Sequence, residues 1–179
     1  MKTVFFDVDT QDDFMLPAGA LYVPGAERMI GVIARLNRWA GEHSIPVVST
    51  KDAHAENDPE FSQWPPHCVA GTAGQRKPPA TLLGGAGQIF IETQTLDCFA
   101  SPDLAGVLER LGADRYVVYG VVTEYCVRLA ALGLLKTGAR VELVTDAVMG
   151  LNAADAAKAL DEIQRAGGQL TTVAEVCGV

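Results

Sequence analysis

Gly120-Val121-Val122-Thr123-Glu124-Tyr125-Cys126-Val127 has the pattern of a junction between a buried strand and a helix. An apolar run at 116–119 precedes it and has the composition of a buried strand, while leucines recur at helical spacing after it. Cys126 is therefore expected in the first turn of a helix that begins where a strand ends. The free N–H groups and positive dipole end of such a helix lower the pKa of a thiol and can hold an oxyanion. Cys126 is a candidate nucleophile, and a small buried cysteine without chemistry is the alternative.

Strand-like and helix-like segments alternate along the rest of the chain. We expect strands at 4–8, 45–50, 88–92, 115–121, 141–144 and 170–173. We expect helices at 29–41, at 103–111, from Cys126 to about 137, and at 152–166. Strands separated by helices pair in parallel through right-handed crossovers. The sequence therefore predicts a single α/β domain over 1–179, a three-layer α/β/α sandwich around a six-stranded, mainly parallel sheet.

The composition limits the partners and the location of the protein. A formal net charge of −8 argues against nucleic acid and anionic membrane surfaces as partners, because these need clustered Lys and Arg. No apolar run approaches the roughly 20 residues that cross a bilayer. The 4 cysteines lie far apart without a CxxC pair, and Met1-Lys2 leads directly into the first strand segment. We therefore expect free thiols, a cytoplasmic protein and a small-molecule partner.

Three of the expected strands are followed by side chains that can do chemistry. Asp9 follows the first strand, Asp52 and His54 follow the second, and Cys126 follows the fourth. The carboxyl ends of parallel strands share one edge of a sheet, so these groups can converge there. A carboxylate can take the proton of a cysteine if burial raises its pKa, which makes Asp9 the candidate base. A loop or helix-capping aspartate is the alternative for Asp9.

The segment after the second strand carries the residue types of a metal site. Asp52 and His54 are alternate residues of an extended segment and point the same way. Glu60 and His67 follow, and two of the 3 histidines of the chain lie in this segment. Carboxylate and imidazole ligands suit Zn²⁺, Mn²⁺ or Fe²⁺. A set of surface polar residues is the alternative interpretation.

These segments resemble the isochorismatase-like cysteine hydrolases, and among them the nicotinamidases. Residues 9–14, Asp-Thr-Gln-Asp-Asp-Phe, look like the D-x-Q-x-D-F opening of that family. Residues 50–54 and 64–72 are similar to the nicotinamidase metal loop, and residues 120–127 are similar to the nucleophile motif. The motifs occur in the family's order over nearly the whole chain.

The resemblance implies a fold and catalytic roles. It implies the strand order 3-2-1-4-5-6, with Cys126 as the nucleophile and Asp9 as its base. It also implies a cis peptide bond between Val121 and Val122, and backbone N–H groups of Val122 and Cys126 that are directed toward the oxyanion.

The resemblance also implies a metal and an assembly. Its metal ligands are Asp52, His54 and His67, and Glu60 stands where relatives have either His or Glu as another ligand. In that picture a divalent metal, first of all zinc, orients the pyridine ring of nicotinamide, and the protein forms a dimer or a tetramer. We further predict a substrate pocket formed by Phe14, Trp64, Thr93 and Tyr125.

One position departs from the family pattern. The family has a catalytic lysine just after the third strand, a few residues before a Phe in a Ser-Ala-Phe-like segment. Counting back from Phe99 leaves Thr93 at this position, or less well Glu92, and no lysine. An ammonium there would stabilise the catalytic carboxylate and thiolate. A cation from elsewhere would have to supply that charge, from Lys51, Arg76 or Lys77.

Three functions of different classes fit this sequence. The first is a metal-containing cysteine amidase that hydrolyses a small carboxamide, best nicotinamide, to nicotinate and ammonia through a Cys126 thioester. The second is a metal- and ligand-binding relative whose hydrolysis is lost or altered with the lysine. The third is a haloacid-dehalogenase-type phosphatase, because residues 5–10 resemble the D-x-D motif of that family. Gln11 stands where that motif has Thr or Val, so we favour the amidase.

Overall fold

The computed structural model describes residues 1–85 and 87–178 and contains one central sheet. Its six strands run in the order β3-β2-β1-β4-β5-β6, and every neighbouring pair is parallel. The strands are β1 (Thr3–Val8), β2 (Val47–Asp52), β3 (Gln88–Thr93), β4 (Arg115–Val121), β5 (Arg140–Met149) and β6 (Gln169–Thr171). The expected fold class and strand order are confirmed.

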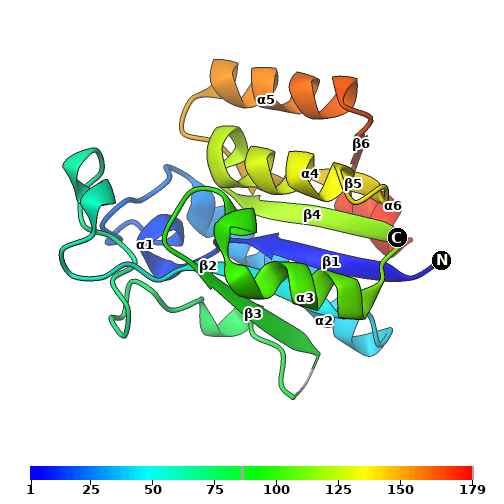
Figure 1. Cartoon of the computed structure of the whole chain (residues 1–179), viewed down its shortest axis with the longest axis horizontal. Coiled ribbons are helices and arrows are strands. Elements are labelled where there is room, and N and C mark those ends of the chain that lie inside the picture. Colours follow the sequence, from blue (N-terminus) through cyan, green and yellow to red (C-terminus); the bar gives the residue numbers. More distant parts are fainter. Residues whose placement is uncertain (86, 179) are drawn as a thin grey trace.

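Helices cover both faces of this sheet (Figure 1). The α-helices are α1 (Asp12–Met15), α2 (Met29–Glu42), α3 (Pro102–Leu111), α4 (Arg128–Leu135), α5 (Ala153–Arg165) and α6 (Val173–Cys177). Short 3₁₀ segments are η1 (Ala26–Arg28), η2 (Pro59–Ser62), η3 (Pro79–Thr81) and η4 (Cys98–Ala100), and a π-helical turn, η5 (Thr123–Val127), precedes α4. Within residues 1–85 and 87–178, no helix is both long and apolar enough to cross a membrane.

The side chains of β1 alternate between two apolar cores. Val4, Phe6 and Val8 pack with residues of α3, α4 and α5 on one face of the sheet. Phe5 packs with residues of α2 and α6 on the other face. Successive strand residues point to opposite faces, so a central strand that is covered on both faces is a continuous apolar run in sequence. Figure 1 accordingly shows α3 and α4 in front of the sheet and α2 and α6 behind it.

Strand β2 begins later than the expected 45 and continues to Asp52. Pro46 has no N–H to donate to the sheet, and its carbonyl accepts a hydrogen bond from the N–H of Phe5 (3.0 Å) just before the paired region. Asp52 is therefore the last residue of the strand, paired with Thr93, rather than the first residue after it. Sheet pairing thus sets the direction of the Asp52 side chain.

The last strand is shorter than expected and is followed by an additional helix. β6 ends at Thr171, and Val173, expected at the end of that strand, begins α6. The Thr172 hydroxyl accepts a hydrogen bond from the N–H of Glu175, and the Glu175 carboxylate accepts one from the N–H of Thr172. This reciprocal capping box starts a helix, and its T-x-x-E spacing is visible in the sequence.

A buried ion pair holds the long segment between β2 and β3 against the sheet. Lys77 Nζ lies 2.9 Å from Asp7 Oδ2, and neither side chain is more than 1% exposed. Asp7 also accepts hydrogen bonds from Thr10, Asn37 and Ser49. A buried charge pair is tolerated when further hydrogen bonds satisfy it. The segment is thereby tied to β1, in the middle of the sheet.

Gly120 allows β1 and β4 to approach closely at their carboxyl ends. Gly120 pairs with Val8, has a φ of +126°, and would place a Cβ 2.1 Å from the Val8 carbonyl oxygen. A side chain at this position would clash with β1 and strain the backbone.

We expect Gly120→Ala to destabilise the protein by at least about 2 kcal/mol, because the new methyl group must displace the β1 backbone. Urea unfolding measures the change. Gly106→Ala is the matched control, because Gly106 is exposed in α3 with no atom within 4 Å of its added Cβ. Alanine is the better helix former, so the control should be as stable as the wild type or more so. Equal stability of both variants would contradict the close-approach argument.

Candidate active site

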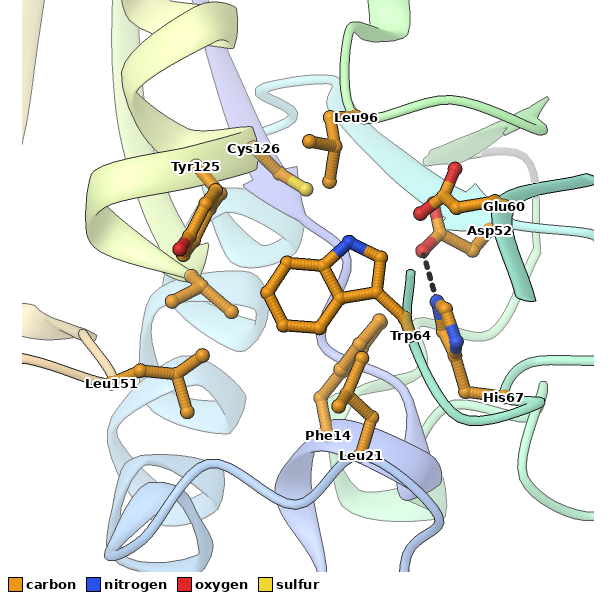
Figure 2. Close-up of a pocket in the computed structure, with 11 residues that line it drawn as sticks. Phe14, Leu21, Asp52, Glu60, Trp64, His67, Leu96, Tyr125, Cys126 and Leu151 are labelled. Atoms are coloured by element: carbon orange, nitrogen blue, oxygen red, sulfur yellow. Dashed lines mark ion pairs between the residues drawn. The ribbon is translucent and has the colours of Figure 1, made fainter. Parts of the chain in front are cut away.

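A cavity lies at the carboxyl edge of the sheet, where several of the expected functional side chains meet (Figure 2). The residues that line it are Phe14, Leu21, Asp52, Glu60, Trp64, His67, Leu96, Val122, Tyr125, Cys126 and Leu151. Figure 2 shows the Trp64 indole between the Cys126 side of the cavity and the side formed by Asp52 and His67. The cavity has a free volume of about 30 Å³. This is room for one or two water molecules.

The nucleophile candidate lies in the π-helical turn between β4 and α4, not in a regular α-helical turn as expected. The N–H groups of Tyr125 and Val127 both donate to the Val122 carbonyl, at 3.0 and 3.2 Å. The peptide bond between Val121 and Val122 is cis, as the resemblance implies. Single π turns are frequent at functional sites, where they displace a side chain from the regular helical position.

The Cys126 thiol is buried beside a carboxylate. Its side chain lies beside the Asp9 carboxylate, and the residue is only 6% exposed. Burial raises the pKa of Cys126 well above its ordinary value, and the nearby carboxylates of Asp9 and Asp52 raise it further. The protein groups around the sulfur therefore favour the thiol over the thiolate.

Asp9 is the partner of this thiol and is equally buried. It has a φ of +48°, a left-handed conformation that aspartate and asparagine adopt more readily than most residues. Its carboxylate accepts a hydrogen bond from the Thr50 hydroxyl, and its N–H donates to the same hydroxyl oxygen at 3.2 Å. Burial, followed by repulsion from Asp52, raises the pKa of Asp9 to about 7. The alternative of a solvated capping aspartate does not match this environment.

Asp52, His54 and His67 form a compact buried cluster on the other side of the cavity. One ligand atom from each lies within 4.8 Å of the others. His54 Nε2 and His67 Nε2 lie 3.6 and 3.7 Å from Asp52 Oδ2. Burial alone would lower the pKa of His54, but Asp52 and Asp58 raise it to about 9. The alternative of separate surface polar residues does not match this packing.

The cluster has the donors that a divalent metal needs. Within the described part of the chain, Asp52 Oδ1 and both ring nitrogens of His54 are buried atoms without a hydrogen-bond partner. Buried polar atoms without partners are rare in native proteins, and a bound ion or water can satisfy them. Two imidazole nitrogens and a carboxylate suit zinc, and the donor set also suits manganese or iron. Glu60 lines the same cavity, but it lies outside the compact three-residue cluster.

The opening motif positions the metal cluster through hydrogen bonds to backbone groups. The Gln11 amide accepts from the Asp52 N–H (2.7 Å) and donates to the Asp52 carbonyl (2.8 Å). The Asp13 carboxylate accepts from the N–H of Cys68 (2.7 Å), the residue after His67. Gln11 is fully buried. The motif therefore positions the backbone at Asp52 and next to His67, two of the three clustered residues.

Three of the four expected pocket residues line the cavity. Phe14 packs against the His67 ring, with ring centroids 5.5 Å apart, and Trp64 meets Tyr125 edge to face at 5.6 Å. Thr93 does not line this cavity but a neighbouring surface hollow of about 420 Å³. Its hydroxyl bonds locally to the backbone of Thr95, so the expected pocket role of Thr93 is corrected.

Lys51 of β2 and Lys77 of the long segment both pair with carboxylates other than Asp9. Lys51 lies 3.4 Å from Glu92, at the edge of the sheet. Lys77 is the nearer cation, because its charge lowers the pKa of Asp9, but this is the smallest of the effects on Asp9. Its ammonium is directed to Asp7 and Thr10. Lys77 therefore compensates Asp7 first and the thiol–carboxylate pair only weakly.

The sequence analysis did not predict three residues of the cavity, Leu21, Leu96 and Leu151, or the contact between Asp58 and His54. Leu96 follows β3 and Leu151 follows β5, so the strand-end rule that located Cys126 could have indicated both. Leu21 comes from the loop after α1, where no pattern distinguishes it. Asp58, which contacts His54, carried no motif signal.

The phosphatase hypothesis required Asp7 as an accessible group. Asp7 is fully buried and paired with Lys77. Its carboxylate is not accessible in this arrangement, so the phosphatase hypothesis is not favoured.

The family model for the isochorismatase domain matches residues 3–175 of this chain. The chain belongs to the isochorismatase family. A curated relative, the nicotinamidase/pyrazinamidase of Mycobacterium tuberculosis, is 30% identical, and the match covers 91% of this chain and 95% of the relative.

Solved structures agree with this assignment. The pyrazinamidase of Pyrococcus horikoshii in complex with zinc is 34% identical with a TM-score of 0.88, over 96% of this chain and 99% of that chain. PnC1 from L. infantum in complex with nicotinate is 29% identical with a TM-score of 0.83, over 95% and 92%. The fold and the length of this family member are therefore those of zinc- and nicotinate-binding relatives.

We expect Asp9→Asn to stabilise the metal-free protein at pH 8 but not at pH 4. The pKa of Asp9 rises from an unfolded value near 3.8 to about 7, so the native state holds a proton that the unfolded state has lost between these values. The free energy of unfolding of the wild type therefore falls as pH rises through this window, by up to about 4 kcal/mol. Asparagine cannot ionise and keeps the left-handed backbone. Unfolding with a chelator present measures the difference, and a difference independent of pH would contradict the assignment.

Proposed function

We propose that this isochorismatase-family protein is a cysteine amidase that hydrolyses a small carboxamide, with nicotinamide as the best substrate, to nicotinate and ammonia. The observation that carries the proposal is that Cys126, beside the buried Asp9 carboxylate, lines one side of an apolar cavity. Asp52 and His67 of the compact cluster with His54 line the other side. The relatives named nicotinamidase and pyrazinamidase support the same substrate class.

The proposed reaction uses one carboxylate twice. Asp9 takes the thiol proton while the Cys126 sulfur attacks the carboxamide carbon, and the Val122 and Cys126 N–H groups stabilise the oxyanion. Ammonia leaves with the proton that Asp9 returns, so a thioester remains on Cys126. Asp9 then takes a proton from water, whose oxygen attacks the thioester, and the proton passes back to the sulfur as nicotinate leaves. The raised pKa of Asp9 suits this exchange of protons near neutral pH.

Asp52, His54 and His67 would hold a divalent metal, with zinc as the first choice and manganese or iron as the others. Glu60 lines the same cavity and would be a further ligand, directly or through water. A bound cation would supply positive charge beside two buried carboxylates and a position for the ring nitrogen of the substrate. The apolar walls formed by Phe14, Trp64 and Tyr125 would hold the flat faces of the ring.

We expect Cys126→Ala to lower ammonia release from nicotinamide by about 10³-fold or more, because no thioester can form without the sulfur. Cys177→Ala is the matched control, because Cys177 is a buried cysteine of α6 in the core on the opposite face of the sheet. It should retain wild-type turnover. Equal rates for Cys126→Ala and the wild type would refute the mechanism, and binding of nicotinate without turnover by the wild type would indicate a relative that has lost hydrolysis.

We expect Trp64 to move when a ring-shaped ligand binds, because a cavity of about 30 Å³ is far smaller than the roughly 150 Å³ that holds benzene. Titration with nicotinate should therefore change the tryptophan fluorescence. The other tryptophan, Trp39, stacks on His43 and Phe5 away from the cavity. The change should persist in Trp39→Phe and disappear in Trp64→Phe. A signal that follows Trp39 instead would contradict this prediction.

A further inference from the structure

Asp58 is an acidic residue of the long segment that lies behind the proposed metal ligands. We propose that Asp58 is a positioning residue of the metal site: one carboxylate oxygen orients the His54 ring, and the other anchors the turn that carries Glu60. The inference rests on the proposed metal site and adds a residue that touches neither substrate nor metal.

The first contact is with Nδ1 of His54, the ring nitrogen other than the one nearest Asp52. Asp58 Oδ2 lies 3.1 Å from His54 Nδ1, and the two side chains are 8% and 0% exposed. The opposite ring nitrogen, Nε2, lies on the Asp52 side of the ring. At this ion-pair distance the carboxylate favours a proton on Nδ1, which leaves the Nε2 lone pair free for a metal.

The His54 ring is also held by its neighbours. The Phe61 ring lies 5.3 Å from it and the His67 ring 4.7 Å, measured between centroids. Full burial between two rings leaves the imidazole little freedom to turn. Asp58 therefore completes a set of contacts that holds the His54 ring in one orientation.

His67 has a similar arrangement, with a backbone carbonyl instead of a carboxylate at its Nδ1 atom. Its Nδ1 lies 2.7 Å from the Pro65 carbonyl oxygen, and its Nε2 is directed to Asp52 as in His54. Both imidazoles thus have an oxygen at Nδ1 and present Nε2 to the same carboxylate. A backbone carbonyl cannot be changed by substitution, whereas Asp58 can, so Asp58 is the accessible test of this arrangement.

The second contact fixes the turn that carries Glu60. Asp58 Oδ1 accepts a hydrogen bond from the Glu60 N–H at 2.9 Å and caps η2. The Glu60 carbonyl in turn accepts from the N–H of Trp64 at 3.1 Å. The Asp58 carboxylate therefore contacts His54 directly and, through the backbone of Glu60, is connected to Trp64.

Asp58→Asn separates the two contacts. Asparagine caps helical turns as well as aspartate does, so the Glu60 contact survives. Its amide N–H₂ replaces the oxygen at His54 Nδ1 and cannot accept the Nδ1 proton. The proton must then move to Nε2 or lose its partner, and either change weakens metal binding by His54.

Asp97→Asn is the matched control. Asp97 Oδ1 accepts a hydrogen bond from the Phe99 N–H at 3.0 Å and caps η4, in the same way that Asp58 caps η2. Asp97 is exposed, and its cap serves η4 rather than the metal cluster. The substitution therefore repeats the loss of one carboxylate oxygen at a 3₁₀ cap without touching the metal site.

The experiment titrates the metal-free full-length proteins with Zn²⁺ against a chromophoric chelator and records the visible absorption spectrum of the Co²⁺ forms. Asp58→Asn should bind Zn²⁺ about 10- to 100-fold more weakly than the wild type and shift the Co²⁺ bands, while Asp97→Asn should match the wild type in both. Circular dichroism verifies that each variant is folded.

The outcomes distinguish the role of Asp58 from the existence of the metal site. Wild-type affinity and an unchanged Co²⁺ spectrum in Asp58→Asn would overturn the role of Asp58 and leave the metal site intact. Failure of the wild type itself to bind either ion would overturn the metal site and this inference together. An equal loss in Asp97→Asn would show that a general loss of charge or capping, not the His54 contact, is responsible.

Discussion

The ion pair between Asp7 and Lys77 is the interaction on which the site depends. The segment between β2 and β3 carries most of the metal cluster, and a connection of that length has many conformations to lose. A charge pair in the core is favourable only when its remaining hydrogen bonds are made, and Asp7 makes them with three neighbours. Together with Gln11 and Asp13, the pair holds the segment in one place relative to β1 and β4.

Negative charge is the second constraint on this site. Asp9 and Asp52 are both buried, and each makes ionisation of the cysteine less favourable. Lys77 is committed to Asp7, and Thr93 carries no charge. A divalent cation beside Asp52 would offset the charge that raises the pKa values of Asp9 and Cys126. The proposed metal would therefore have an electrostatic role in addition to holding the substrate, and it would link metal occupancy to the reactivity of the thiol.

Much of the fold follows from local patterns. β1 is a continuous apolar run because both of its faces are covered, and β4 followed by leucines at helical spacing predicts a strand and a helix. The same patterns placed β2 too early, because the apolar residues around Pro46 resemble a strand although Pro46 has no N–H to donate to the sheet. α6 was missed because Val173 reads as a continuation of β6, although the Thr172–Glu175 capping box marks a helix start.

The sequence by itself determined which residue types reach the carboxyl edge of the sheet, because strand ends and alternating polar residues are local features. Only the tertiary structure decided which of them meet. Thr93 turns to a separate hollow, Leu151 enters the cavity, and Asp58 reaches behind His54. These outcomes depend on the paths of loops between strands that are distant in sequence, and such paths are set by buried polar contacts that no periodicity reveals.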